Sequence, residues 1–417
     1  MRIKEFFTSE KYTLLSLFIF ALVIRVLYVI RLSPSAFSPD GGDWIHIATG
    51  IVNGMGYGGN WRSPVYPFFL AAVFFFKAGS ILLVRIAQAL VDSFTCIVIY
   101  FIAKRIFDRR AGMLAALLTA LYPYFIYNTG DILKETLFTF LISLSILLFY
   151  HAIERDRLIL KIAAGISFGL SVLCKSTILP FYMSAFIWYI AFHPPQIQIK
   201  DKIRGALVIF SFMLLTIAPW TIRNYFHYHH FVLVETHGPM IFWQANNPVD
   251  LVYEDIPDLD VQRLPDEYAD CCNTAELNEV LKLPQFEGDK VFMRKALSFI
   301  RDNRSAYITL LRKRFFHYWR LFPRIATKRN KLIAKLTSGW ILPFGWLGII
   351  LAWKKYWRKT GLLVLLLASF TCVHIVFWAM IRYRVPIDPF VIIFCSYTLI
   401  WIYDRTKASV TAVPKPL

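Results

Sequence analysis

The chain alternates long apolar segments with short polar ones. An α-helix needs about 20 apolar residues to cross the hydrocarbon of a bilayer, and fewer near an interface. On this basis we predict spans at 13–31, 80–103, 111–127, 132–151, 158–174, 178–192, 203–219, 337–353, 361–380 and 385–403. A further apolar segment, 64–76, is short and begins with two prolines, so we interpret it as a re-entrant or surface helix. The pattern predicts an all-α integral membrane protein with about 10–11 transmembrane helices.

The positive residues between the spans predict how the chain is oriented. Short cytoplasmic loops are enriched in Lys and Arg. In a ten-span layout, six basic segments fall on the same side: Met1–Lys4, Lys104–Arg110, Arg155–Lys161, Lys200–Arg204, Lys354–Lys359 and Arg405–Lys407. Full crossing of 64–76 would break this agreement. The opposite, non-cytoplasmic side then carries the loop 32–63, the hairpin 128–131 and the long stretch 220–336.

This layout divides the chain into three parts. An N-terminal transmembrane module, 1–219, contains the first outer loop, for which we expect a helix. An extracytoplasmic loop follows at 220–336, and transmembrane helices with a short cytoplasmic tail occupy 337–417. Within the long loop, 292–301 and 307–319 have the composition of amphipathic helices that lie along a membrane surface.

Composition agrees with a membrane protein and excludes other classes. Hydrophobic residues make up 57% of the chain, against roughly 45–50% in soluble domains. The net charge of +19 is spread over short segments and forms no soluble basic face, so we expect no nucleic-acid partner. The sequence contains no P-loop and no dinucleotide-binding fingerprint. Cys271 and Cys272 are adjacent and do not have zinc-ligand spacing.

Candidate chemistry begins in the first outer loop. Asp40 and Asp43 lie three residues apart at the start of the expected helix, and Gly41 and Gly42 follow Asp40 directly. We place Asp40 just before that helix. One interpretation is that these acids are catalytic; the other is that either acid merely caps the helix, because Asp is a favoured N-cap residue.

A second pair of acids occurs at the next outer turn. Asp131 and Glu135 are four residues apart, so we expect them to share a helix face, with Glu135 about one turn inside the span. An ionisable residue inside a membrane helix is a functional candidate by default. The alternative is a salt bridge with Lys134.

Basic residues also occur at the outer ends of predicted spans, where the charge rule disfavours them. These residues are Lys175, Arg223, Arg382 and Arg384. They could extend toward lipid headgroups. We favour instead a phosphate in the membrane plane as their partner, since Arg recognises phosphate through two hydrogen bonds and Lys through its charge.

Taken together, these motifs resemble the polytopic, lipid-dependent glycosyltransferases of the GT-C fold. The similarity is greatest to bacterial relatives of the dolichyl-phosphate-mannose–protein mannosyltransferases and the aminoarabinose lipid A transferases. It extends over residues 1–403 except the middle of the long loop and rests on motifs in this order: Asp43-Trp-Ile-His-Ile-Ala, Gly54-Met-Gly-Tyr57, Arg62-Ser-Pro-Val-Tyr-Pro67, Asp131 to Glu135, Pro219-Trp-Thr-Ile-Arg223-Asn224, Asn246-Asn247-Pro248 and Arg382-Tyr-Arg-Val-Pro386.

The resemblance implies a reaction and roles for particular residues. A sugar would move from a polyprenyl-phosphate donor to an acceptor on the non-cytoplasmic face. Asp40 would match the catalytic carboxylate that takes the acceptor's proton. In relatives with two acids in this loop, the acids are adjacent. Here Gly41 follows Asp40 and the next acid is Asp43, so Asp43 is the other candidate for this role. Glu135 or Asp131 would match the second acid. The donor phosphate would be held by Arg62, Lys175, Arg382 and Arg384, and the other outer-face candidates are Arg223 and Tyr66.

Two other functions fit a polytopic chain. A transporter or flippase of lipid-linked sugars would place charges or broken helices near the bilayer midplane, whereas here the charges gather at one face. A membrane scaffold would use the acids only as helix caps.

Besides the lipid-linked donor and membrane lipid, we expect an acceptor that is a protein, a lipid or a surface glycan. The family resemblance favours the bacterial inner membrane. We predict no metal ligands, and a divalent cation remains an open question.

Overall fold

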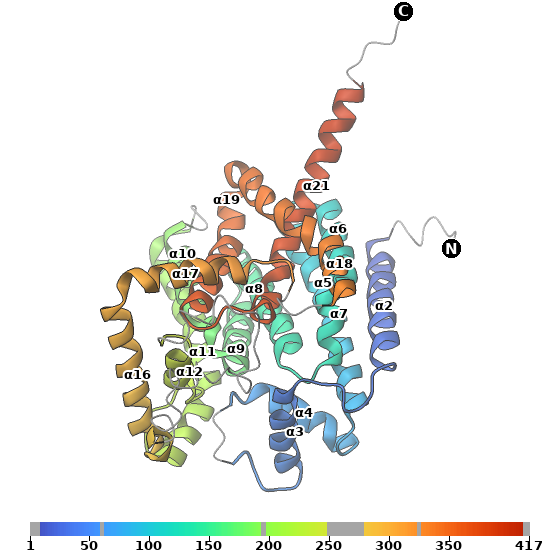
Figure 1. Ribbon diagram of the computed structural model, residues 1–417. Coiled ribbons are helices and arrows are strands. Elements are labelled where there is room, and N and C mark those ends of the chain that lie inside the picture. The colour runs from blue at the N-terminus through green and yellow to red at the C-terminus, as the bar shows by residue number, and fades with distance from the viewer. Residues whose placement is uncertain (1–8, 59–61, 193–196, 248–278, 323–326, 412–417) are drawn as a thin grey trace, which may run out of the picture. The chain divides into compact units, whose positions relative to one another are not determined.

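The computed structural model describes residues 9–58, 62–192, 197–247, 279–322 and 327–411. Within these ranges every regular element is a helix (Figure 1), which confirms the all-α class. The chain forms two compact units, the first from 1–234, 336–367 and 385–417 and the second from 235–335 and 368–384. The predicted basic N-terminal segment Met1–Lys4, the pair Cys271 and Cys272, and Pro248 of the asparagine motif lie outside the described residues.

The helices are long and apolar enough for a multi-pass membrane protein. In the described ranges, six stretches meet the length and hydropathy of a span: Glu10–Val29, Ile81–Ile106, Glu135–Arg155, Ile199–Tyr228, Lys328–Val376 and Ile381–Ala408. Shorter apolar helices occur at Val65–Phe76, Leu158–Cys174 and Ser176–Phe192. Large apolar side chains such as Phe75, Leu215 and Ile350 are exposed, as expected where the neighbouring solvent is lipid rather than water.

The first unit begins with helices that follow the predicted spans closely. Its helices are α2 (Glu10–Val29), α3 (Pro39–Val52), α4 (Val65–Phe76), α5 (Ile81–Ile106), α6 (Arg109–Leu121), α7 (Pro123–Gly130), α8 (Glu135–Arg155), α9 (Leu158–Cys174), α10 (Leu179–Phe192), α11 (Ile199–Tyr228) and α21 (Asp388–Thr411). The first part of α19 (Ser338–Val376) also belongs to it.

Ion pairs and hydrogen bonds place the basic segments of the first unit on one face. Lys104 contacts Glu10 at 2.6 Å, and Arg110 contacts Asp404 at 2.7 Å. Arg105 pairs with Glu154. The Tyr150 hydroxyl donates to the carbonyl of Lys359, which places Lys354–Lys359 on the same face as Glu154. Gly205 lies against Lys161, which brings Lys200–Arg204 beside Arg155–Lys161 on that face. The described basic segments therefore share one face, as predicted.

Helix α4 does not cross the unit. The residue before its N-cap, Ser63, contacts the carbonyl of Cys174 at the end of α9. The following helix, α5, starts at Ile81 and runs from that face to the basic one, where Lys104 lies in its last turn. Both ends of α4 are therefore on the face opposite the basic segments. With 12 residues, the helix is about 18 Å long at 1.5 Å per residue, which agrees with the predicted surface or re-entrant helix.

Three predicted spans differ from the observed helices: one is divided and two are joined. The span 111–127 consists of α6 and α7, separated at Tyr122, because proline at 123 lacks an N–H and disfavours helical backbone before it. Most of the segments 337–353 and 361–380 instead belongs to the single helix α19, which ends at Val376. Between them, Lys354–Thr360 contains no proline or glycine, so the backbone remains helical through the charged segment.

Small residues let α9 pack closely against α11. A Cβ atom added at Gly165 would lie 2.5 Å from the carbonyl oxygen of Ile209, and one at Gly169 would lie 2.5 Å from Thr216. Glycines four residues apart face the same side of a helix, and small residues at that spacing bring membrane helices together. This contact fixes the end of α9, which carries Lys175.

The second unit contains α12 (Gly238–Gln244), α16 (Gln285–Asp302), α17 (Arg304–Tyr318), α18 (Lys328–Leu336) and α20 (Ile381–Arg384). Helices α16 and α17 confirm that 292–301 and 307–319 are helical, but the amphipathic character predicted for 307–319 is wrong, because the apolar and polar residues of α17 are not separated onto two faces. On α16, Phe292, Ala296 and Phe299 are buried at helical spacing, and the ring of Phe292 packs 5.1 Å from that of Trp243. The remaining residues of α16 leave a polar face, which is the amphipathic pattern expected.

Candidate active site

A buried arginine of α5 holds the first outer loop. Arg85 is 1% exposed. Its guanidinium donates hydrogen bonds to the carbonyls of Ser33 at 2.9 Å and Ala36 at 2.6 Å, and to that of Gly130 at 2.8 Å. Because each of these bonds is charge-assisted, Arg85 ties the segment before α3 to the end of α7. This places the first outer loop beside the 128–131 turn.

Asp131 is one of the residues that fix the start of α3. Its Oδ1 accepts hydrogen bonds from the backbone N–H groups of Ser38 at 2.8 Å and Ile132 at 2.9 Å. The Gln88 amide donates to the Asp131 carbonyl at 2.8 Å and accepts from the Tyr66 hydroxyl at 2.8 Å. Asp131 and Tyr66, both predicted site residues, are therefore buried in the support of the loop.

The predicted shared face of Asp131 and Glu135 is wrong. Asp131 has extended backbone at the end of α7, and Glu135 is the first residue of α8 rather than one turn inside it. The carboxylate of Asp131 bonds the N–H of its neighbour Ile132. This local competition with helical hydrogen bonding, which is characteristic of Asp, delays the helix start.

Asp40 and Asp43 lie on the first turns of α3, half-exposed. Proline 39 is the first helical residue and Ser38 is the N-cap, so Asp40 is inside the helix rather than before it, and neither acid is the capping residue. Arg62 Nη2 lies 3.7 Å from Asp40 Oδ1 and is in direct contact with Asp43 Oδ2. The structure thus brings together three predicted residues, with one cation between two carboxylates.

Trp44 connects this cluster to the cations behind it. The indole is 1% exposed. The Arg62 guanidinium lies 4.3 Å from its centroid, and Lys134 Nζ lies 5.3 Å from it. The Tyr66 ring packs edge-on against it at 5.5 Å. An aromatic face attracts cations, so Trp44 keeps two positive groups close to each other despite their repulsion.

Ser63 extends the cluster to the end of α9. Its hydroxyl donates to the carbonyl of Cys174 at 2.7 Å and accepts from Lys134 Nζ at 3.1 Å. The next residue, Lys175, is buried, with its Nζ 5.7 Å from the ring of Phe138. Phe138 is one turn after Glu135 on α8, and Glu135 is 1% exposed. The predicted Lys175 and Glu135 therefore lie in the same neighbourhood, deeper than Asp40 and Asp43.

Arg223 holds the end of the first loop against α11. Its guanidinium lies 4.9 Å from the ring centroid of Trp220 and 5.5 Å from that of Tyr57, and it donates to the carbonyl of Gly58. The Tyr57 hydroxyl donates to the carbonyl of Arg62 at 2.8 Å. Arg223 thus acts on the backbone that presents Arg62.

Arg382 and Arg384 belong to the second unit. Arg384 is fully buried, and its Nη1 donates to the carbonyls of Tyr318 at 3.1 Å and Arg320 at 2.5 Å. Arg382 lies 5.9 Å from the ring centroid of Tyr383. Within its own unit, Arg384 therefore stabilises the end of α17.

Sequence reasoning missed four residues that organise the site. Arg85, Gln88, Trp44 and Ser63 make the contacts described above. A signal existed for Arg85, since it is a charged residue within the predicted span 80–103. Trp44 and Ser63 lie inside the motifs that begin at Asp43 and Arg62 but received no role of their own, and Gln88 is a polar residue within the same predicted span as Arg85. Among the described residues, no group of three or more His, Cys, Asp or Glu side chains is arranged to hold a metal ion.

Comparisons with known proteins identify the fold. Residues 61–222 match the family model described as dolichyl-phosphate-mannose-protein mannosyltransferase. The apo structure of the Archaeoglobus fulgidus oligosaccharyltransferase superposes with a TM-score of 0.61 and 18% identity, covering 98% of this chain and 53% of that one. The same organism's oligosaccharyltransferase AglB, in complex with an inhibitory peptide and a dolichol-phosphate, gives 0.58 and 18% over the same shares. A search of curated protein sequences finds no match.

These similarities confirm the predicted fold. The chain is a GT-C-fold membrane protein, and it spans about half the length of the archaeal enzyme to which it is similar.

Proposed function

We propose that this protein is a membrane glycosyltransferase that moves a sugar from a polyprenyl-phosphate donor to a hydroxyl or amine of an acceptor on the non-cytoplasmic face. The observation that carries the proposal is the cluster of Asp40, Asp43 and Arg62, whose acids are 45% and 56% exposed. It lies on the face opposite the basic segments. The family match over 61–222 and the dolichol-phosphate bound to the archaeal protein of the same fold support a lipid-phosphate donor.

In the proposed reaction, the acceptor oxygen or nitrogen attacks the anomeric carbon while the bond from that carbon to the phosphate oxygen breaks. A carboxylate takes the acceptor's proton. We assign this to Asp40, because its Oδ1 lies 3.7 Å from Arg62 Nη2, whereas the carboxylate of Asp43 is in direct contact with that guanidinium. Asp43, held directly by Arg62, orients the guanidinium.

The leaving phosphate gains negative charge as the bond breaks, and cations stabilise it. Arg62 is positioned for this role by Asp43, Trp44 and the backbone contact of Tyr57. Lys175, at the end of α9, is the second phosphate ligand that we propose. Glu135, buried one turn from the Phe138–Lys175 contact, would assist acceptor binding. Arg382 and Arg384 remain proposed ligands of the donor phosphate.

The alternative of a transporter or flippase predicts charges at the middle of the membrane. Arg25 and Asp92 do lie within α2 and α5. However, Arg25 Nε is bonded to Asp92 at 2.5 Å, and Nη1 is bonded to the carbonyls of Ala21 and Ala120, both at 3.0 Å. A cation engaged in this way stabilises helix packing, so the pair does not favour transport.

The test is transfer of labelled sugar by the purified protein in detergent from a panel of short-chain polyprenyl-phosphate sugars. Asp40→Asn should lose activity by about 10²–10⁴-fold, the usual contribution of a general base. Asp156→Asn is the matched control, since Asp156 is an exposed acid paired with Lys161 on the other face. Transfer by Asp40→Asn at the wild-type rate would remove Asp40 from the mechanism. No transfer with any donor, together with movement of lipid-linked sugar across liposomes, would favour the transporter.

A further inference from the structure

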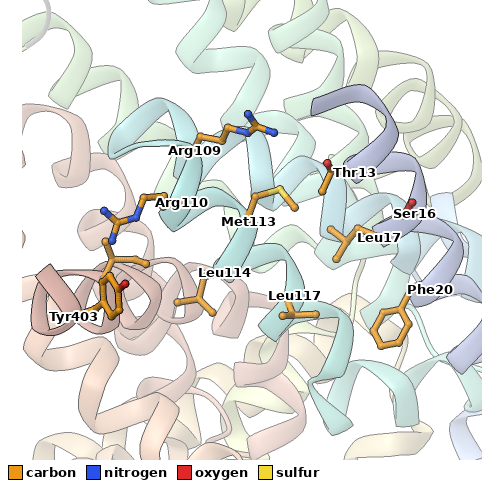
Figure 2. A pocket seen from close by; sticks show the side chains of 11 residues that line it. Thr13, Ser16, Leu17, Phe20, Arg109, Arg110, Met113, Leu114, Leu117 and Tyr403 are labelled. Atoms are coloured by element: carbon orange, nitrogen blue, oxygen red, sulfur yellow. The ribbon is translucent and has the colours of Figure 1, made fainter. Parts of the chain in front are cut away.

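An open apolar groove lies far from the candidate active site, between α2, α6 and α21. Its volume is about 930 Å³. Its walls are mostly apolar and include Leu17 of α2, Leu117 of α6 and Ile400 of α21. At one end, which we call the rim, lie Arg109, Arg110 and Tyr403. Figure 2 shows the residues of α2 and α6 on two sides of the hollow, with Arg109 and Arg110 at the same end as Thr13.

We infer that this groove binds an anionic phospholipid of the bilayer, with acyl chain in the apolar part and phosphate at the two arginines. The inference does not depend on the proposed glycosyl transfer.

The depth of the groove fits one leaflet. Arg109 and Leu117 are eight residues apart on α6, which is about 12 Å along a helix. Half of the hydrocarbon core is about 15 Å. An acyl chain that begins at the arginines would therefore lie in the groove for most of its leaflet. Tyr403 lies near the charged end, at the level where interfacial aromatic residues gather.

The charge at the rim selects the headgroup. Arg109 and Arg110 are exposed at the start of α6, and Arg405 stacks on Trp401 with its guanidinium carbon 4.6 Å from the ring centroid. Asp404 holds Arg110 through two bonds of 2.7 and 3.2 Å, so it reduces the charge of Arg110 while fixing the direction of its guanidinium. The cations Lys104, Arg109, Arg110 and Arg405 outnumber the acids Glu10, Asp108 and Asp404.

This rim belongs to the face that carries the basic segments. If that face is cytoplasmic, as the positive-inside rule predicts, it meets the leaflet that holds anionic lipids, and Lys and Arg side chains near that surface attract them. The acyl chains of a zwitterionic lipid would fill the groove equally well, but its headgroup would be attracted less strongly to the arginines at the rim. The inference therefore commits to a net negative headgroup.

The experiment is a lipid titration of the delipidated, monodisperse protein, followed by native mass spectrometry. The probes are phosphatidylglycerol and phosphatidylcholine with identical acyl chains, and a short-chain polyprenyl phosphate is added in competition with phosphatidylglycerol. For the wild type we expect phosphatidylglycerol to bind at least tenfold more tightly. The double variant Arg109→Gln/Arg110→Gln should lose this preference. Arg358→Gln is its matched control, an exposed arginine on α19 stacked on Trp357.

A second variant tests the groove itself while keeping the charges. Leu117→Trp fills the hollow and should weaken binding of both lipids severalfold. Leu121→Trp, one turn further on α6 and outside the lining, should leave binding unchanged.

Three outcomes would overturn the inference. Equal binding of the two lipids would remove the role of the arginines. Unchanged phosphatidylglycerol binding in Leu117→Trp would place the lipid on the basic surface rather than in the groove. Retention of a polyprenyl phosphate in preference to phosphatidylglycerol would assign the groove to a different lipid.

Discussion

Replacing Arg25 by methionine should destabilise the protein more than almost any other single change in the first unit. Arg25 is fully buried on α2, and Asp92 of α5 is 2% exposed. The guanidinium also donates to the carbonyls of Ala120 at 3.0 Å and Thr119 at 3.4 Å. Ala120 is in the last turn of α6, whose carbonyls lack N–H partners within the helix. One side chain therefore joins three helices.

The magnitude follows from what each substitution leaves behind. Breaking a buried ion pair by removing one partner costs about 3–5 kcal/mol, because the other charge remains buried. Arg25→Met leaves both the carboxylate of Asp92 and the carbonyl of Ala120 without this donor, so we place it at the upper end. Asp92→Leu leaves Arg25 charged but still bonded to carbonyls, so we place it at the lower end.

The double variant Arg25→Met/Asp92→Leu removes both charges. Replacing a buried pair by apolar residues of similar volume is often neutral or stabilising. What remains is the loss of the donor to the carbonyls, at about 1–3 kcal/mol for a buried group left unsatisfied. The double variant should therefore be more stable than Arg25→Met alone.

The assay is thermal unfolding in detergent by intrinsic tryptophan fluorescence, at one scan rate because large proteins often unfold irreversibly. The entropy of unfolding is about 2.1 cal/mol/K per residue, so in a unit of roughly 300 residues 1 kcal/mol corresponds to about 1.6 °C, and Arg25→Met should lower the apparent Tm by about 8 °C. Val23→Met, on the exposed face of α2, is the control. A Tm for Arg25→Met equal to that control, or a double variant no more stable than Arg25→Met, would refute the reasoning.

Three further changes test other parts of the structure. Asp131→Asn keeps an oxygen that accepts from Ser38, so transfer activity should survive in it and fall in Asp131→Ala; loss of activity in both would make the carboxylate itself catalytic. Gly169→Leu places a side chain against Thr216 and should lower the apparent Tm, while the exposed Ile166→Leu should not. Burial raises the pKa of Asp289 in the second unit; since its ionised form is disfavoured when folded, Asp289→Asn should raise Tm at pH 7, with the gain shrinking toward pH 4.

Much of the site could be predicted because charge placement is visible in the sequence. Asp40, Asp43 and Arg62 lie together as expected, and Lys175 and Glu135 lie behind them. The details that failed are backbone details. The start of α8 at Glu135 depends on the hydrogen bond from Ile132 to Asp131, and the break at Tyr122 depends on the following proline. Both effects are local in the sequence, but each occurs within an apolar segment whose pattern favours a continuous helix.

The sequence by itself determined that this chain crosses a membrane, where most of its helices lie and which segments share a face, since these depend on apolar length and on charge near each helix end. Only the tertiary structure decided which side chains meet. Arg85 bonds to carbonyls that are 45 to 52 residues away, and Ser63 bonds to one that is 111 residues away. Such contacts depend on how helices pack, and a residue's own neighbours in the sequence do not encode its partners in space.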